Sequence, residues 1–554
     1  MADLVESKVR FSSFTVSDGT KIGLSEDDVL VVVGPNNAGK SQLLRDLESH
    51  FELARNGVYS GKVVVSIELV HDPVEEILAV FEKFRENGTE FYSAHGVRAH
   101  QNYVHNALSY PASPVQFGGI HLFFLKRISS DDRLSVVAPS AAAGENRIET
   151  PGQILYDSEE LLTQVSAIFQ EAFGRELFVD YRSGGIIPIY VGQKPPIPDG
   201  LDRVSDGYVK LVRACDKLHE QGDGMKSFGG ILLSTLVVHR NITLIDEPEA
   251  FLHPPQERVI GKIIGNRMNG QVICSTHSKN VLQGFLESDR NNIRVMRIAR
   301  NGSVNNVSEI SPDEVRELWK DPVFRYSTAL DALFHEQTIL CEADPDCRFF
   351  EAVQGAVSVT AQKDTHFVPC GGKAAFPKFI RALKKLSIPV LAVLDLDVLN
   401  DEQAIRRIYE AQGGTWSEVQ ALWKRVDIAV REGVPPANLE DTKKEIEKLL
   451  ENWTDGNPPQ SDIIEALKRT RPWGKVKELG LVAIPPGDAQ RNADELLKVL
   501  AQRSIFPIPV GTLEKFVPTV GNHGIKWLNE VFERHSVDSA ELKTAREFMT
   551  RVLG

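Results

Sequence analysis

The sequence has no long apolar run, no paired cysteine motif and no excess of basic residues. No stretch reaches the roughly 18 to 20 apolar residues that a membrane-spanning helix needs. The N-terminal MADLVESKVRFSSF carries acidic residues where a signal peptide would be basic and then apolar. The five scattered cysteines lack the CxxC spacing of a zinc site, and their odd number argues against a disulfide framework. We therefore expect a cytoplasmic protein with reduced thiols and no membrane partner.

The length and charge of the chain set further limits. A chain of 554 residues exceeds one ordinary core, so we expect two or three domains of about 100 to 200 residues each. The net charge is −13, and Lys and Arg are what displace counterions from a phosphate backbone. Any nucleic-acid surface must therefore be local. Lys373 to Lys385 and Lys468 to Lys477 are the candidate basic stretches, although each could equally be a solvated helix face.

A strand, a glycine loop and a helix are predicted in succession between Val29 and Leu47. The loop from Gly34 to Ser41 (GPNNAGKS) fits G-x-x-x-x-G-K-[ST] at every fixed position. In such a loop the backbone N–H groups surround phosphates, the lysine reaches the β- and γ-phosphates and the serine ligates Mg²⁺. The residues that we assign to ATP binding are Asn36, Asn37, Gly39, Lys40 and Ser41.

Two later apolar strands end in polar residues. NITLIDEP ends in Asp246-Glu247, and QVICSTHS ends in Ser275-Thr276-His277. The carboxyl ends of such strands face the ligand crevice of an α/β sheet. We expect Asp246 to hold Mg²⁺ and Glu247 to orient and deprotonate the attacking water. His277 stands where a γ-phosphate-sensing histidine would lie.

These motifs together resemble an ABC-type ATPase head of the branch that contains SMC, RecF and the OLD (overcoming lysogenization defect) nucleases. The resemblance implies a signature loop at Gly224 to Gly230, whose Ser227 and Gly229 would contact the γ-phosphate on a second subunit. It also implies a homodimer, or a higher even-numbered oligomer, joined through the heads. His253 replaces the D-loop aspartate of transport-type relatives but fits the EPEAxLHP pattern of OLD heads, and no Q-loop glutamine is located.

The first half of the chain is thus predicted to be an α/β head over residues 1–325. No leucine-rich heptad arm separates the two halves of the cassette, unlike in SMC proteins. The intervening residues mix helical patterns with Gly/Pro turns such as GQKPPIPDG. We expect a modest helical or dimerisation insertion over about residues 150–220.

A second acidic constellation follows in the C-terminal part. EQTILCEAD delivers Glu342 to the end of a predicted strand, and IPVLAVLDLD delivers Asp395 and Asp397 to the end of another. The carboxylates of a strand-end D-x-D can converge on one ion, and their oxygens suit Mg²⁺ or Mn²⁺. Surface acids are the alternative for each of them taken alone.

This order of carboxylates resembles the Toprim fold, and a head followed by a Toprim domain resembles the OLD nucleases over nearly the whole chain. The resemblance implies a Toprim domain over residues 326–554 with a helical insert at about 401–480. It adds Asp346 to the metal ligands, although Ala343 replaces the glycine of the family's E-G-x-x-D/E pattern. It also adds Glu514 from the G-x-L-E element GTLE. A catalytic lysine is implied as well, with Lys526 as the candidate and Lys515 as the alternative.

The leading hypothesis is an ATP-binding and ATP-hydrolysing, Mg²⁺- or Mn²⁺-dependent DNA endonuclease. Its role in antiviral defence comes from the resemblance alone. One alternative is an ATPase sensor whose Toprim centre needs a partner RNA or protein. Another is a DNA-repair ATPase that binds DNA without cutting it.

Overall fold

The computed structural model of the chain divides into two compact units, Met1–Arg325 and Tyr326–Gly554. The residues that it describes are 9–52, 61–94, 97–109, 120–142, 150–267, 270–290, 292–325, 327–357, 363–433, 439–453, 459–469 and 472–554. Within these ranges, no helix is both long and apolar enough to cross a membrane.

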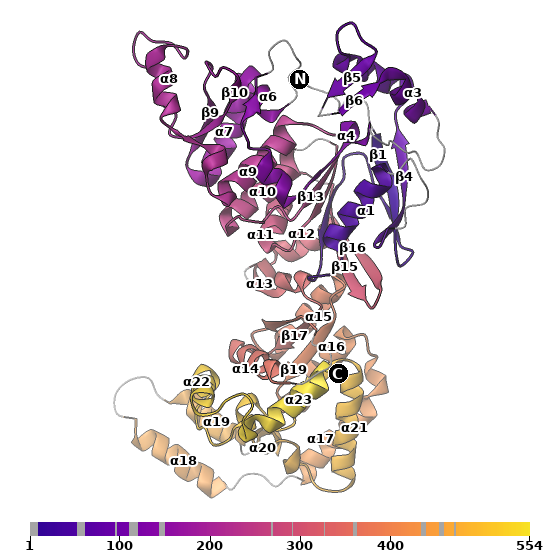
Figure 1. Cartoon of the computed structure of the whole chain (residues 1–554). Helices are drawn as coiled ribbons and strands as arrows, with labels where there is room; N and C mark the ends of the chain where they lie inside the picture. Colours follow the sequence, from indigo (N-terminus) through magenta and orange to yellow (C-terminus); the bar gives the residue numbers. More distant parts are fainter. Residues whose placement is uncertain are drawn as a thin grey trace. The chain divides into compact units, whose positions relative to one another are not determined.

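The first unit is built on a six-stranded sheet (Figure 1). Its strands in sheet order are β16 (Val304–Ile310), β15 (Ile293–Asn301), β3 (Val29–Val33), β14 (Gln271–Ser275), β13 (Ile242–Asp246) and β7 (Leu125–Ile128). All pair in parallel except β16 with β15. The register sets Asp246 opposite Ser275, and Ser275 opposite Val32. The glycine loop after β3, the acidic pair after β13 and the His277 segment after β14 therefore lie at the same edge of the sheet.

Helix α1 (Lys40–Glu52) follows the glycine loop and shares one hydrophobic core with two sheets. Its buried Leu43, Leu47 and Phe51 join the core of the large sheet to that of a three-stranded antiparallel sheet. That smaller sheet contains β2 (Lys21–Gly23), β1 (Val9–Val16) and β4 (Val64–His71). The packing fixes the helix whose first turn carries Lys40.

Residues 150–220, expected to form a helical insertion, contain both helices and strands. The helices are α6 (Pro151–Asp157), α7 (Glu159–Phe173) and α8 (Asp206–Arg213). The strands β9 (Glu176–Val179), β11 (Ile189–Gly192) and β12 (Asp216–Lys217) form an antiparallel sheet. Phe178, Tyr190, Tyr208 and Val212 bury a small core of their own there. The β-branched and aromatic residues of these short segments favour strands, which the helical interpretation overlooked.

The second unit has a four-stranded parallel sheet (Figure 1). Its strands in sheet order are β18 (Thr365–Pro369), β17 (Gln337–Cys341), β19 (Val390–Leu394) and β20 (Ile505–Pro507). Leu340 pairs with Ala392 and Leu394 with Pro507. Glu342 and Asp395 thus follow neighbouring strands at one edge.

Helices cover this sheet and fill the long connection between β19 and β20. The core against β17 contains α14 (Asp344–Gly355), α22 (Gly524–Arg534) and α23 (Lys543–Leu553). The connection holds α16 (Glu402–Ala411), α17 (Gln420–Gly433), α18 (Leu439–Glu451), α19 (Gln460–Arg469), α20 (Pro472–Leu479) and α21 (Asp488–Gln502). The helical insert expected at about 401–480 therefore extends to Gln502.

Two glycines lock the end of α20 against the segment that follows β20. Gly511 has a φ of +110°, and a Cβ there would lie 2.0 Å from the carbonyl oxygen of Lys477. Gly480 has a φ of +72°, and its Cβ would lie 2.4 Å from the carbonyl oxygen of Pro509. The Gly511 carbonyl also accepts a hydrogen bond from Leu396 N at 2.8 Å. This glycine clasp, Gly480 with Gly511, fixes α20 beside the turn that carries Asp395 and Asp397.

Replacing Gly511 with Ala tests the clasp. We expect a loss of about 1 to 3 kcal/mol in unfolding free energy from the backbone conformation alone, and more from the clash with Lys477. Gly355→Ala is the control, because its Cβ meets nothing within 4 Å. Equal urea midpoints for Gly511→Ala and Gly355→Ala would show that the close approach does not exist.

Candidate functional site

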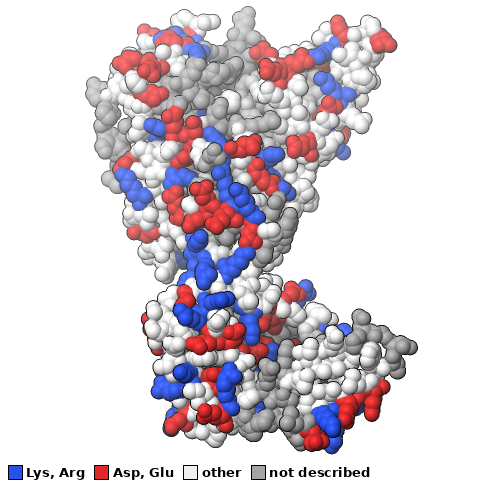
Figure 2. Space-filling view, turned by 180° about the vertical axis from the view of Figure 1, so that it is seen from behind, with Lys and Arg blue, Asp and Glu red and all other residues white. Residues whose placement is uncertain are grey.

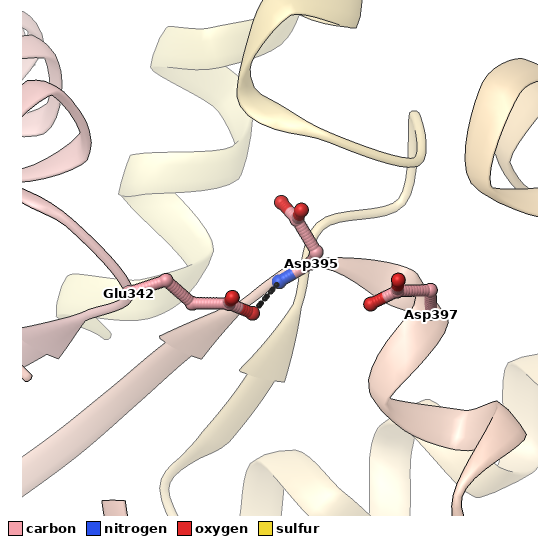
Figure 3. A group of neighbouring side chains, drawn as sticks. All are labelled: Glu342, Asp395 and Asp397. Atoms are coloured by element: carbon pink, nitrogen blue, oxygen red, sulfur yellow. Dashed lines mark hydrogen bonds between the residues drawn. The ribbon is translucent and has the colours of Figure 1, made fainter. Parts of the chain in front are cut away.

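Three carboxylates converge at the edge of the second unit's sheet. Glu342 follows β17, Asp395 follows β19, and Asp397 lies in the 3₁₀ turn Leu396–Asn400. One oxygen of each lies within 4.8 Å of the other two. The Asp395 N–H donates a hydrogen bond to Glu342 Oε1 at 3.1 Å, which orients the glutamate toward the two aspartates (Figure 3). The arrangement matches the oxygen ligand set that Mg²⁺ and Mn²⁺ prefer.

Two lysines supply positive charge to this cluster. Lys477 Nζ, from α20, lies 3.1 Å from Asp397 Oδ2 and 3.5 Å from Asp395 Oδ2. Lys373, just before α15 (Phe376–Lys385), lies 3.5 Å from Asp397 Oδ1. The Lys477 side chain is 44% exposed. Sequence reasoning had placed both lysines only in basic stretches.

The pKa values reflect how densely the negative charge is packed. Burial, with the Glu342 charge next, raises the pKa of Asp395 well above its usual range. Burial also raises the pKa of Glu342, against the opposing effects of the Asp395 N–H and the two lysines. Both groups would be ionised most readily with a bound cation nearby.

Asp346 and Glu514 lie close to the cluster but outside its set of three. Asp346 Oδ2 accepts a hydrogen bond from Ala343 N at 2.7 Å. Burial, then the charges of Glu342 and Glu514, raises its pKa to about 7. Glu514 accepts hydrogen bonds from Gly524 N and Thr512 Oγ1. Burial would raise its pKa, but hydrogen bonds from backbone N–H groups and from Thr512 lower it.

The two lysines expected from the resemblance lie elsewhere. Lys515 Nζ is 3.9 Å from Glu478 Oε1. Lys526 is exposed on α22 and, within the described residues, forms no ion pair with the carboxylates. Among the described residues, Lys477 and Lys373 are the lysines that contact the aspartates of the cluster, and the catalytic role of Lys526 stays a prediction.

The glycine loop of the first unit has the backbone that a phosphate cradle requires. Gly39 and Asn37 have φ values of +99° and +61°, the left-handed region open mainly to Gly and Asn. Lys40 Nζ donates hydrogen bonds to the Gly34 and Pro35 carbonyls at 2.8 Å each. Burial lowers the pKa of Lys40, opposed by the charges of Glu247, Glu249 and Asp246.

The acidic pair and the histidine meet at the same edge. Asp246 Oδ1 accepts a hydrogen bond from Ser275 Oγ at 2.6 Å. His277 Nε2 lies 3.1 Å from Glu247 Oε1. This contact raises the pKa of His277 and lowers that of Glu247. Glu247 also has a φ of +47°, a strained conformation that is common at functional sites.

Two family models match this chain. The model described as "AAA domain, putative AbiEii toxin, Type IV TA system" matches residues 214–283. The model described as "Overcoming lysogenization defect protein-like, TOPRIM domain" matches residues 333–397. An ATPase domain followed by an OLD-like Toprim domain matches the order of an OLD-family ATPase–Toprim fusion. These domains indicate ATPase and nuclease activity, and the predicted fold class is confirmed.

No curated protein sequence matches this chain. Among solved structures, an SMC head bound to the C-terminal winged-helix domain of ScpA has 15% identity and a TM-score of 0.35, over 55% of this chain and 99% of that one. The SMC head domain from Thermotoga maritima has 14% identity and a TM-score of 0.29, over 55% and 98%. An SMC head from Pyrococcus furiosus has 13% identity and a TM-score of 0.32, over 56% and 99%. At these values the likeness carries no conclusion about function.

The predicted signature residues Ser227 and Gly229 lie inside the first unit. Ser227 is fully buried in the middle of α9 (Asp223–Leu232), and its Oγ donates a hydrogen bond to Ala250 O at 3.1 Å. Gly229 is buried against Leu218, whose Cδ2 would be 2.9 Å from a Cβ. Both residues make these contacts within one copy of the chain, and their predicted contact with a nucleotide on a second copy stays a prediction.

Sequence reasoning missed two charged residues beside the acidic pair. Glu249 accepts hydrogen bonds from Thr276 Oγ1 at 2.9 Å and His277 N at 2.7 Å, and burial raises its pKa. Arg133, fully buried in α5 (Ser130–Ser135), donates to Asp246 O at 2.9 Å. Its Nε and Nη2 have no hydrogen-bond partner among the described residues. No motif marks Arg133, and the only sequence signal for Glu249 is its place as the third acid of DEPE.

Asp346 provides a test of the metal site. Its folded pKa of about 7 lies above the ordinary 3.8. The contribution of neutral Asp346 to the free energy of unfolding is therefore fully present below about pH 4. It is lost as the pH rises through 7, and the loss is on the order of 4 kcal/mol. We expect Asp346→Asn to stabilise the metal-free protein at pH 8 but not at pH 4. Urea unfolding followed by tryptophan fluorescence measures this.

Saturating Mg²⁺ at pH 8 supplies the second arm of this test. A cation that binds the folded state stabilises it by mass action, so Mg²⁺ should stabilise the native sequence more than Asp346→Asn. Exposed Asp344→Asn is the matched control. Parallel stability curves for all three proteins with pH and with Mg²⁺ would remove Asp346 from the site.

Proposed function

We propose that this chain is an ATP-regulated, metal-dependent endonuclease that cuts DNA at the cluster of Glu342, Asp395 and Asp397. The observation that carries the proposal is the meeting of these carboxylates with Lys477 and Lys373 at one sheet edge. Such a centre offers oxygen ligands to a divalent cation and positive charge to a phosphodiester in the same place.

The three carboxylates fit a divalent cation, and Asp346 and Glu514 are the candidates for a second. Mg²⁺ or Mn²⁺ would supply Lewis-acid polarisation of the phosphodiester when bound. The chain's own part is to hold the ligands in place. The Asp395 N–H orients Glu342, and the N–H groups of Gly371 and Gly372 each donate to the Glu342 carbonyl at 2.9 Å.

Lys477 is the residue that we assign to charge stabilisation at the phosphate. Its side chain is partly exposed, and its ammonium group contacts two aspartates. A fixed cation acts strongly where negative charge develops, because it needs no reorganisation during the reaction. The glycine clasp supplies that fixation by holding the Lys477 backbone against Gly511.

ATP would bind in the first unit on the glycine loop, with Lys40 turning from the loop carbonyls to the phosphates. Asp246 and Ser41 would hold Mg²⁺, Glu247 would activate water, and His277 would sense the γ-phosphate. We further propose an even-numbered oligomer joined through the heads, in which ATP sets the geometry. A role in antiviral defence, with a partner protein or RNA as the trigger, rests on the family resemblance alone.

Plasmid cleavage tests the nuclease proposal. We expect purified protein with Mg²⁺ or Mn²⁺ to convert supercoiled DNA to nicked or linear forms. Asp395→Asn combined with Asp397→Asn should abolish this, because the site loses two of its three anionic ligands. Exposed Glu432→Gln with Glu447→Gln removes the same charge far along the chain and should leave cleavage intact. Cleavage that survives the double aspartate substitution would sink the proposal.

Single substitutions at three lysines locate the catalytic cation. Lys477→Met should slow cleavage by about 100-fold or more, the usual loss when one charge-stabilising group is removed. Lys477→Arg should recover part of the rate. Lys515→Met and Lys526→Met serve as matched controls and should stay within a few-fold of the native rate. A large loss for Lys526→Met with none for Lys477→Met would favour the family's lysine position instead.

A further inference from the structure

One helix beside the carboxylate cluster exposes only basic side chains. On α15 the exposed residues are Lys378, Arg381, Lys384 and Lys385. The other six positions, among them Phe376, Phe379 and Ile380, are buried. The spacing of three and four residues puts the basic side chains on one face of the helix. We call these four residues the basic face of α15.

The basic face begins at the candidate catalytic centre. Lys373, three residues before α15, contacts Asp397. At the other end Lys384 Nζ donates a hydrogen bond to Gln412 O at 2.8 Å, and Arg503 donates to the adjacent Gly413 O at 3.3 Å. The positive charge of Arg503 lowers the pKa of Lys384 further after burial, so the two cations are near neighbours. The positive charge therefore runs from the carboxylates along the whole helix.

This concentration is local in a protein of net charge −13. Figure 2 shows one face of the molecule, on which groups of basic and groups of acidic side chains lie next to one another. On α18, by contrast, the exposed Lys443, Lys444 and Lys448 alternate with exposed glutamates. A helix with mixed charge is typical of a solvated surface, whereas α15 has no acidic residue at all.

We propose that the basic face of α15, with Arg503, binds the phosphate backbone of duplex DNA and leads it to the carboxylate cluster. The proposal rests on the proposed nuclease function and names the surface that its substrate occupies. A ten-residue helix is about 15 Å long, which matches roughly four base-pair steps of a duplex. An anionic membrane is the less suitable partner, because the apolar residues of α15 are buried and none is available for insertion.

Salt dependence of DNA binding tests this surface without requiring cleavage. In the full chain, Lys378→Gln, Arg381→Gln and Lys385→Gln are combined, and Lys384 is kept because it bonds to Gln412. Binding to a short labelled duplex in EDTA is measured over a series of salt concentrations. Log K falls as log salt rises, and each lost phosphate contact makes this slope less steep by about 0.9. We expect a slope shallower by about 2 to 3 and at least about tenfold weaker binding at low salt.

The matched control removes the same charge from α18. Lys443→Gln, Lys444→Gln and Lys448→Gln together should leave the slope within about 0.5 of the native value. Lys378→Arg with Lys385→Arg keeps the charge and should retain binding, which separates a lost contact from a misfolded helix. Thermal unfolding of every variant checks the fold.

Three results would overturn the proposal. The salt slope of DNA binding could be unchanged in the α15 variant, or the α18 variant could lose as much DNA affinity as the α15 variant. The α15 variant could also bind DNA normally and lose only its binding to vesicles of phosphatidylcholine and phosphatidylserine. Failure of the nuclease proposal looks different. In that case the native protein does not cut the plasmid, yet its DNA binding still depends on α15.

Discussion

The arrangement of charged side chains in the second unit depends on the repulsion between Glu342, Asp395 and Asp397. Three carboxylates with oxygens within 4.8 Å of one another cannot all be ionised unless positive charge lies nearby. Lysines from two distant segments supply this positive charge. Lys373 precedes α15, and Lys477 lies near the end of α20. Burial is the largest cause of the raised pKa values of Asp395 and Asp346, and the charge of Glu342 raises both further. A divalent cation would offset this negative charge, so the repulsion between the carboxylates favours cation binding.

The ATPase unit also places several carboxylates at one sheet edge, but different residues balance their charge. Asp246, Glu247 and Glu249 also lie at the carboxyl ends of parallel strands, but their positive partners are His277, Lys40 and the buried Arg133. Arg133 joins the acidic edge to the signature helix, since a Cβ on Gly230 of α9 would lie 2.1 Å from the Arg133 carbonyl oxygen. A displacement at Asp246 would therefore reach α9, whose Ser227 is buried in this conformation. The two units share strand-end chemistry and differ in how the charge is balanced.

The sequence was sufficient wherever a motif is contiguous and ends a strand. The loop at Lys40, the pair at Asp246 and the carboxylates at Glu342 and Asp395 all belong to this kind, because parallel strands bring their carboxyl ends to one edge. Lys477 was not predictable in the same way. It lies 82 positions after Asp395. The glycine clasp brings it close to the carboxylates, and the contacts of the clasp produce no periodic sequence pattern that would predict this. Arg133 has no motif, and the strands between 150 and 220 were too short to outweigh the helical pattern around them.

The insertion between β19 and β20 also has a consequence for synthesis of the chain. β20 and the Gly511 segment follow β19 by more than a hundred residues, and pairing across so long a loop is slow and late. A nascent chain that has emerged as far as Asp397 carries the three carboxylates but neither Lys477 nor the strand that completes the sheet. The cluster of carboxylates and lysines is therefore assembled only when most of the unit has left the ribosome. A chain that ends before Lys477 would carry the three acidic residues without the lysine and the strand that complete their surroundings.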